Sequence, residues 1–194
     1  MTTFVFDIEK AVAAAAYVTK KRGGEISIFI LIKMLYAGER HALLEWHRPI
    51  TGDRLCAMPK GPVLSRTYDL IKGRILGGES DMKKWAQHFS PVEQNKVKLL
   101  TDPDFDFLSQ REREALDAGF EEIEALEKQH GTIAEILHAR WPEWKDPKTT
   151  CGKGSAPIEV SDILDQGSDD EDEVQRIVLE IQAVQSAKAA LQTN

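Results

Sequence analysis

The chain has 194 residues, of which 42% are hydrophobic and 29% charged, a composition typical of one globular domain with room for a tail. Its apolar stretches 11–18 and 26–32 are much shorter than the roughly 20 residues that a membrane-spanning helix needs. The two cysteines, Cys56 and Cys151, form no CxxC pair, and no basic leader with a cleavage site is visible. We therefore expect a cytoplasmic protein with reduced cysteines and no contact with a membrane.

Charge is distributed unevenly along the chain, whose formal net charge is −7. Residues 1–100 carry 16 Lys and Arg against 10 Asp and Glu, a net of +6, whereas residues 101–194 carry 9 against 22, a net of −13. The basic half has no clustered stripe that could follow a phosphate backbone, so the sequence argues against nucleic acid as a partner. The acidic half suits a basic protein surface, or it serves only as a solvated face that aids solubility.

Two helices are predicted at the start of the chain. Asp7 can cap a helix over residues 7–21, whose alanine-rich centre has high helix propensity and which ends at Gly23-Gly24. A second helix is predicted over residues 27–46, because apolar residues recur there at helical spacing before Arg48-Pro49 stops it. These apolar residues are Phe29, Ile32, Leu35, Tyr36, Leu43 and Trp46.

Residues 50–63 have no helical pattern and predict a small β-hairpin inserted between helices. Thr51-Gly52-Asp53 is a turn sequence, and residues 54–58 suit a short strand. Pro59-Lys60-Gly61-Pro62 then turns the chain a second time.

Helical signals resume after the hairpin. Short helices are expected over residues 66–72, with Ser65 as the cap, and over residues 81–88. Three further helix starts have the capping-box pattern, in which Ser or Thr is followed three residues later by Glu. They are Ser90-Pro91-Val92-Glu93, Ser109-Gln110-Arg111-Glu112 and Thr132-Ile133-Ala134-Glu135. The helix that begins at Ser109 is expected to run to about residue 129, before Gly131.

The last part of the chain predicts a short helix over residues 157–165, then the acidic run Asp169–Glu173 and a final amphipathic helix. The apolar stripe of this helix either packs on the domain or binds a partner. It comprises Val174, Ile177, Val178, Ile181, Val184 and Leu191. We therefore predict a mainly α fold, with a compact multi-helix domain and a small inserted β-hairpin over residues 1–167, and an acidic run plus amphipathic C-terminal helix over residues 168–194.

The sequence has no residues with the spacing of a catalytic or metal site. His41 and His47 are six residues apart, whereas two ligands on one helix face need a spacing of about four. The segment Asp102-Pro103-Asp104-Phe105-Asp106 resembles the start of an EF-hand loop but lacks the glycine and glutamate that such a loop needs. Since a GxSxG motif and a phosphate-loop sequence are also missing, we predict that the protein is not an enzyme and uses no cofactor or metal.

Three neighbouring segments form a specific pattern. They are Leu35-Tyr36-Ala37-Gly38-Glu39-Arg40-His41, Arg48-Pro49-Ile50-Thr51-Gly52-Asp53-Arg54 and Lys60-Gly61-Pro62-Val63-Leu64-Ser65-Arg66-Thr67-Tyr68-Asp69. The pattern resembles the Panacea domain of SocA-like antitoxins and phage-associated proteins, with its R-P-L/I-T-G-D turn and H/K-G-P-V-x-S-x-x-Y-D segment. The likeness covers about residues 8–165 and includes Trp141-Pro142-Glu143-Trp144 as the turn after a helix. Gly38 departs from the usual Ala and weakens the helix by up to about 1 kcal/mol.

The residues that carry this resemblance, here called the motif residues, have a structural and a partner-binding interpretation. They are Tyr36, Glu39, Arg40, His41, Arg48, Pro49, Thr51, Gly52, Asp53, Lys60, Gly61, Pro62, Ser65, Tyr68 and Asp69. In the structural interpretation Gly52, Gly61, Pro49 and Pro62 fix the backbone of the hairpin.

The structural interpretation also assigns roles to the aromatic and charged motif residues. Tyr36 and Tyr68 are expected in the core with their hydroxyls in contact with water. Arg40, Asp53 and Asp69 are candidates for an ion-pair network. In the partner-binding interpretation the same side chains face another protein.

The resemblance implies a protein partner and no cofactor. Members of the family are described as antitoxins that neutralise toxins by direct binding, so a cognate toxin is the expected partner. One branch is an adaptor that hands its toxin to an AAA+ protease, which makes such a protease a second candidate partner. A transcriptional autoregulator, a phage-encoded counter-defence protein and a hydrolase built on Asp53, Ser65 and Asp69 are the remaining alternatives. A homodimer is compatible with the sequence.

Overall fold

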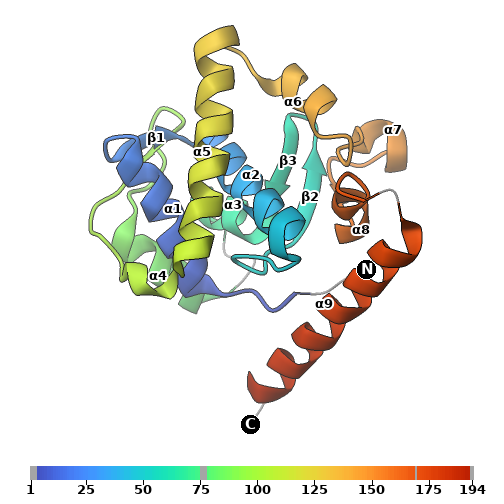
Figure 1. Ribbon diagram of the computed structural model, residues 1–194. Coiled ribbons are helices and arrows are strands. Elements are labelled where there is room, and N and C mark those ends of the chain that lie inside the picture. The colour runs from blue at the N-terminus through green and yellow to red at the C-terminus, as the bar shows by residue number, and fades with distance from the viewer. Residues whose placement is uncertain (1–3, 75–77, 169, 193–194) are drawn as a thin grey trace.

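The computed structural model describes residues 4–74, 78–168 and 170–192, and its fold is mainly helical, as predicted (Figure 1). The helices are α1 (Ile8–Lys21), α2 (Ile28–Trp46), α3 (Ser65–Ile71), α4 (Glu79–His88), α5 (Gln110–His130), α6 (Ala134–Arg140), α7 (Pro147–Cys151), α8 (Val160–Leu164) and α9 (Glu171–Gln192). The strands are β1 (Glu25–Ser27), β2 (Leu55–Met58), β3 (Gly61–Leu64), β4 (Lys96–Lys98) and β5 (Ala156–Pro157), and a 3-10 helix η1 spans Phe105–Phe107. No described helix is both long and apolar enough to cross a membrane.

Helix α2 lies at the centre of the fold, with α5 crossing it on one side and the β2–β3 hairpin on another (Figure 1). The hydroxyl of Ser27 caps its start by accepting a hydrogen bond from the backbone N–H of Ile30 at 3.2 Å. Nearly every residue from 28 to 39 is buried, including Lys33 and Glu39, as expected for a helix that is apolar on all sides. Each polar side chain on α2 therefore needs a partner from another segment.

Two glycines allow α2 and α5 to approach closely. A Cβ atom on Gly119 of α5 would lie 2.4 Å from the backbone nitrogen of Gly38 and 2.9 Å from the carbonyl oxygen of Met34. A Cβ atom on Gly38 would lie 2.9 Å from Cδ2 of Leu116. Gly38 is expected to weaken α2, but it allows α5 to cross at a distance that a larger residue would prevent.

Helix α1 forms as predicted and supplies a second buried surface. The side chain of Asp7 accepts a hydrogen bond from the backbone N–H of Lys10 at 3.1 Å, which caps the helix. Residues 11–16 are almost completely buried, and five of these six are alanine. Because alanine side chains are small, α1 packs closely on the body of the domain.

The predicted β-hairpin is confirmed and belongs to a larger sheet. Strands β2 and β3 pair antiparallel, from Leu55 opposite Leu64 to Met58 opposite Gly61. Strand β5 adds to the other edge of β2, with Cys56 opposite Pro157. This third strand was not predicted, because the segment that contains it is about a hundred residues away in the sequence. A separate two-stranded sheet joins β1 to β4.

The Ser109 capping box is confirmed, and the other two predicted boxes are wrong. Ser109 accepts from the backbone N–H of Glu112 at 3.3 Å, and the Glu112 carboxylate accepts from the backbone N–H of Ser109 at 2.8 Å. The hydroxyl of Ser90 instead accepts from the backbone N–H of Lys98 in β4 at 3.0 Å, so residues 90–95 form a turn into that strand. Helix α6 begins at Ala134 after Ile133, which makes no side-chain cap.

The C-terminal helix α9 packs on the domain through part of its apolar stripe. Val174, Ile177 and Ile181 are buried, whereas Leu179 on the opposite face is 63% exposed. Asp169 of the acidic run and the side chain of Leu191 lie outside the described residues. Figure 1 shows that α9 extends away from the body towards its C-terminal end. The short helix predicted over residues 157–165 is confirmed only for Val160–Leu164, because Ala156–Pro157 is strand β5.

Replacing Gly119 by alanine is expected to destabilise the fold by about 1–3 kcal/mol, because the new methyl group meets backbone atoms of α2 that cannot move aside. Alanine has a helix propensity about 1 kcal/mol better than glycine, so a net loss measures the steric cost of the crossing. Urea unfolding of the variant and the wild type gives the difference. Gly154→Ala is the matched control, since no atom lies within 4 Å of the added Cβ, and its midpoint should stay close to the wild-type value.

Candidate functional site

The first group of motif residues forms a buried cluster with the turn after α6. The hydroxyl of Tyr36 donates to Oε1 of Glu143 at 3.0 Å, and Nε of Arg40 donates to the same oxygen at 2.9 Å. The Tyr36 ring packs on Trp141 with a centroid distance of 5.1 Å. Burial, and then the Glu143 charge, raise the pKa of the Tyr36 phenol well above its usual value. The expectation of a hydroxyl in contact with water is therefore wrong for Tyr36, because its hydroxyl donates its hydrogen bond to the buried Glu143 carboxylate.

His41 and Arg40, although adjacent in sequence, belong to different clusters. The Nε2 atom of His41 lies 3.2 Å from a carboxylate oxygen of Glu122 on α5, and Nε of Arg140 donates to the other oxygen at 2.5 Å. Burial alone raises the pKa of Glu122, but the hydrogen bonds from His41 and Arg140 outweigh it and lower the pKa to about 2. His41 thus ties α2 to α5 near the end of α6.

Glu39 is a buried carboxyl group that anchors the turn after α2. Its Oε2 accepts from the backbone N–H of Thr51 at 3.2 Å and from the Thr51 hydroxyl at 3.3 Å. The other oxygen has no hydrogen-bond partner among the described residues. Burial raises the pKa of Glu39 to about 8, against the hydrogen bonds from Thr51. Glu39 is therefore mainly protonated at neutral pH, which removes the cost of burying a charge.

Asp53 caps the start of α3 although it lies in the loop before strand β2. Its carboxylate accepts from the backbone N–H of Arg66 at 2.9 Å, from the backbone N–H of Thr67 at 2.7 Å and from the Thr67 hydroxyl at 2.7 Å. The predicted cap, Ser65, is instead the first residue of α3 and makes no capping hydrogen bond. Burial raises the pKa of Asp53, and the hydrogen bonds from Thr67 and Arg66 oppose that rise.

The proposed network of Arg40, Asp53 and Asp69 is wrong. Arg40 pairs with Glu143, Asp53 binds the start of α3, and Asp69 pairs with Arg74 at 3.5 Å. The three side chains therefore stabilise three separate junctions, because each is on a different element with a nearer partner.

The two glycines of the motif shape the chain where other segments approach. Gly52 has φ 67°, and a Cβ atom there would lie 2.2 Å from the carbonyl oxygen of Val5. Gly61 has φ 99°, and its Cβ would lie 2.9 Å from Nζ of Lys33. Both conformations are strained for residues with a side chain, so the predicted backbone role of these glycines is confirmed.

Lys33 is buried beneath the hairpin. Its Nζ donates to the carbonyl oxygen of Pro62 at 2.6 Å, and burial lowers the pKa of Lys33 to about 7. The hairpin is also held by Trp144, whose indole N–H donates to the carbonyl oxygen of Met58 at 2.9 Å and whose ring stacks on His138 at 3.5 Å. The motif thus connects α2, the hairpin and the turn after α6.

Few motif side chains reach the surface. Seven are buried, namely Tyr36, Glu39, Thr51, Gly52, Asp53, Gly61 and Pro62. Six are half-buried, namely Arg40, His41, Pro49, Ser65, Tyr68 and Asp69. The two that are exposed are Arg48, after α2, and Lys60, in the hairpin turn. Tyr68 lies beneath the guanidinium of Arg74, 5.8 Å from its ring centroid. The motif therefore mainly builds the framework, and a partner can touch only its outer members.

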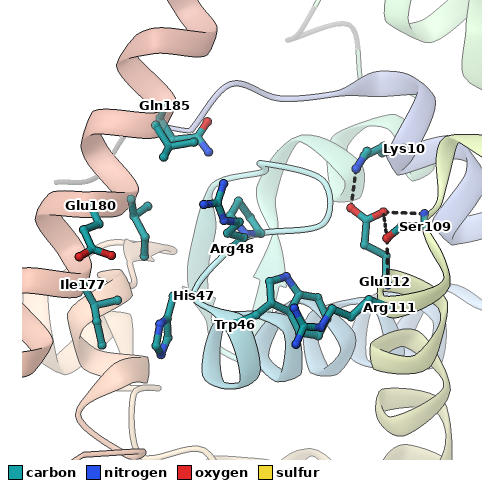
Figure 2. Close-up of a pocket in the computed structure, with 13 residues that line it drawn as sticks. Lys10, Trp46, His47, Arg48, Ser109, Arg111, Glu112, Ile177, Glu180 and Gln185 are labelled. Atoms are coloured by element: carbon teal, nitrogen blue, oxygen red, sulfur yellow. Dashed lines mark hydrogen bonds and ion pairs between the residues drawn. The ribbon is translucent and has the colours of Figure 1, made fainter.

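A pocket of about 310 Å³ lies between α9 and the turn that ends α2 (Figure 2). We call it the α9 pocket. Its lining residues are Lys10, Trp46, His47, Arg48, Pro49, Ser109, Arg111, Glu112, Ile177, Glu180, Ile181, Val184 and Gln185. Only Arg48 and Pro49 among them are motif residues. Sequence reasoning missed the others because they come from four helices and the turn after α2, and no local pattern shows that these meet.

Two contacts hold the walls of the α9 pocket. Lys10 forms an ion pair with Glu112, which joins α1 to the start of α5. The side-chain oxygen of Gln185 accepts from the backbone N–H of Val5 at 3.2 Å, which joins α9 to the N-terminal segment. His47 lies beside Ile177 (Figure 2) and ends α2 in a left-handed conformation with φ 60°. Side-chain contacts therefore tie two of the lining helices, α1 and α9, to neighbouring segments.

No group of three or more His, Cys, Asp and Glu side chains within residues 4–74, 78–168 and 170–192 is arranged to hold a metal ion. His41 is bound to Glu122, and His47 lines the α9 pocket. The described part of the chain thus combines a buried polar framework with the α9 pocket.

A family model described as "Antitoxin SocA-like, Panacea domain" matches residues 31–145. This range is more than half of the chain, and it runs from α2 to the turn that contains Glu143 and Trp144. It therefore includes all the motif residues and both of their partners in that turn. No curated protein and no solved structure matches the chain significantly.

Replacing Asp53 by asparagine is expected to destabilise the fold by at least about 2 kcal/mol, since the amide nitrogen faces N–H donors that lose their acceptor, at about 1–3 kcal/mol each. Ser65→Ala removes no cap and should cost at most about 1 kcal/mol. Urea unfolding of both variants checks this order. If Ser65→Ala cost more than Asp53→Asn, the capping role assigned to Asp53 would be wrong.

Glu39→Gln should remove a pH dependence from stability. The folded pKa of Glu39 is about 8 and exceeds the ordinary value of 4.5, so its contribution is complete below pH 4.5 and is lost as the pH rises towards 8. The wild type should therefore lose up to about 1.4 kcal/mol per pH unit in this range relative to the variant. Urea unfolding at about pH 5 and about pH 8 measures the difference. The control Glu121→Gln, at an exposed site on α5, should keep the wild-type slope.

Proposed function

Because the chain belongs to the family of SocA-like antitoxins with a Panacea domain, we propose that it is an antitoxin that neutralises a cognate toxin by binding it directly. The observation that carries this proposal is the match of the family model over residues 31–145. The complex would mask the active surface of the toxin, and the chain itself would perform no catalysis. We place both proteins in the cytoplasm, where the free thiols of Cys56 and Cys151 stay reduced.

The structural roles of the motif residues support a binding function over a catalytic one. A hydrolase built on Asp53, Ser65 and Asp69 needs a carboxylate free to act as a base. The Asp53 carboxylate already accepts hydrogen bonds from Arg66 and from Thr67, on both oxygens. Asp69 pairs with Arg74. These carboxylates are committed to the structure of the domain, which leaves surface recognition as the function that the fold serves best.

Co-expression of the tagged protein with the product of the neighbouring open reading frame tests the proposal. Growth should be arrested by that product alone and restored by the tagged protein, and the two should co-purify in a fixed ratio. The variant Asp53→Asn, which weakens the framework, should rescue growth less well. Failure of the wild-type protein to rescue growth and to co-purify with the product would contradict neutralisation by binding.

The same experiment separates the adaptor alternative. Rescue with loss of the toxin from the cells, reversed in a strain without the AAA+ protease, would indicate delivery to that protease. Rescue with the toxin retained in a complex would indicate sequestration. A gel shift at low salt, with and without toxin, tests the transcriptional alternative, which predicts binding to the operator despite the net charge of −7.

A further inference from the structure

The α9 pocket contains two cations that have no acidic partner among the described residues. Arg48 is exposed, and its guanidinium makes no hydrogen bond or ion pair with any described residue. Arg111 lies over the ring of Trp46, with 5.1 Å between the guanidinium carbon and the ring centroid, and has no acidic partner in the described part of the chain. Figure 2 shows Arg48 between α9 and the Lys10–Glu112 pair, with Arg111 beside Trp46 below it.

The position of Arg111 does not favour the helix that carries it. It stands in the first turn of α5, where a cation opposes the helix dipole by roughly 0.3–1 kcal/mol. The capping box already serves the backbone N–H groups of Ser109 and Glu112 in this turn. The excess positive charge of the pocket therefore comes from the side chains of Arg48 and Arg111, opposed by Glu180 alone, since Lys10 and Glu112 neutralise each other.

The α9 wall of the pocket is apolar except for Glu180 and Gln185. Ile177 and Ile181 of α9 line it together with Val184, and Trp46 lies across from them. The volume of about 310 Å³ is near the lower end of the range of about 300–1,000 Å³ found for ligand pockets. It suits a short segment with one or two inserted side chains and is too small for a whole helix.

We propose that the α9 pocket receives a segment of the toxin that carries a carboxylate next to a bulky apolar side chain. The carboxylate pairs with Arg48 and Arg111, and the apolar side chain packs between Trp46 and the isoleucines of α9. This inference rests on the proposed function, because the toxin is the partner. Charge complementarity selects the occupant: the pocket is locally cationic on a chain whose net charge is −7. A nucleic acid is disfavoured, because the net charge of −7 repels the rest of the polyanion beyond the phosphate in the pocket.

Charge reversal in the pocket tests this inference. The double variant Arg48→Glu/Arg111→Glu should bind the purified toxin at least tenfold more weakly than the wild type in a titration and should fail to rescue growth. An acid in the first turn of α5 favours that helix, so the variant should fold, which circular dichroism checks. The control Lys72→Glu/Lys153→Glu makes the same change in net charge at exposed sites outside the pocket and should bind within twofold of the wild type.

The outcomes of this titration are distinct. Equal weakening by both double variants would show a general charge attraction and would overturn the pocket, as would an affinity of the Arg48→Glu/Arg111→Glu variant within twofold of the wild type. Either result leaves the proposed function intact, because the wild type still binds. A wild-type protein that binds no toxin would instead overturn the proposed function, and the pocket assignment with it.

Crosslinking identifies the occupant. The photoreactive residue p-benzoylphenylalanine placed at position 180, in the pocket wall, should crosslink to the toxin, whereas the same residue at position 179, on the exposed face of α9, should not. Mass spectrometry should find a toxin peptide with an Asp, a Glu or the C-terminal carboxylate next to a large apolar residue. A crosslinked peptide without a carboxylate, or a crosslink only within the antitoxin chain, would overturn the inference.

Discussion

Burial of α2 on every side is the constraint on which the rest of the structure depends. A buried helix that carries Lys33, Tyr36 and Glu39 has to find a partner for each of them inside the protein. The partners come from three other segments: the carbonyl oxygen of Pro62 in the hairpin, Glu143 in the turn after α6, and Thr51 in the turn after α2. The polar groups of one helix thus position the segments packed around it.

The motif residues outside α2 hold the segments that pack around this helix. Gly52 and Gly61 admit Val5 and Lys33 at short distance, and Asp53 holds the start of α3. Such a framework leaves the outer surface free to vary. A binding protein needs this separation, because the residues that contact a partner can then differ while the buried network keeps the scaffold rigid. The α9 pocket fits this view, since most of its lining residues lie outside the motif.

Sequence patterns correctly predicted helix caps that depend only on neighbouring residues. The cap at Asp7 and the capping box at Ser109 are made within four residues, and both form as the sequence indicates. Ser90 has the same local pattern, but its hydroxyl serves the backbone of Lys98 because a strand pairs there. A tertiary contact overrode the local preference.

Long-range interactions were less accessible from the sequence. The role of Asp53 as the cap of α3, thirteen residues away at Arg66, has no sequence signature, whereas an adjacent Ser65 does. Strand β5 depends on pairing with β2 across the chain. The α9 pocket depends on where α9 packs, which the apolar stripe predicts only as a choice between the domain and a partner. Most helices and the hairpin were therefore predictable, whereas the helix expected at Ser90 and the site that the elements form were not.

The buried state of α2 also determines the proton stoichiometry of folding. In the unfolded chain near neutral pH, Lys33 carries a proton and Glu39 does not. In the folded protein, with pKa values of about 7 for Lys33 and about 8 for Glu39, both groups are mainly neutral between these values. At these two positions, folding therefore removes a proton from the lysine and adds one to the glutamic acid. Lys33 and Glu39 therefore enter the interior uncharged, without an ion pair between them.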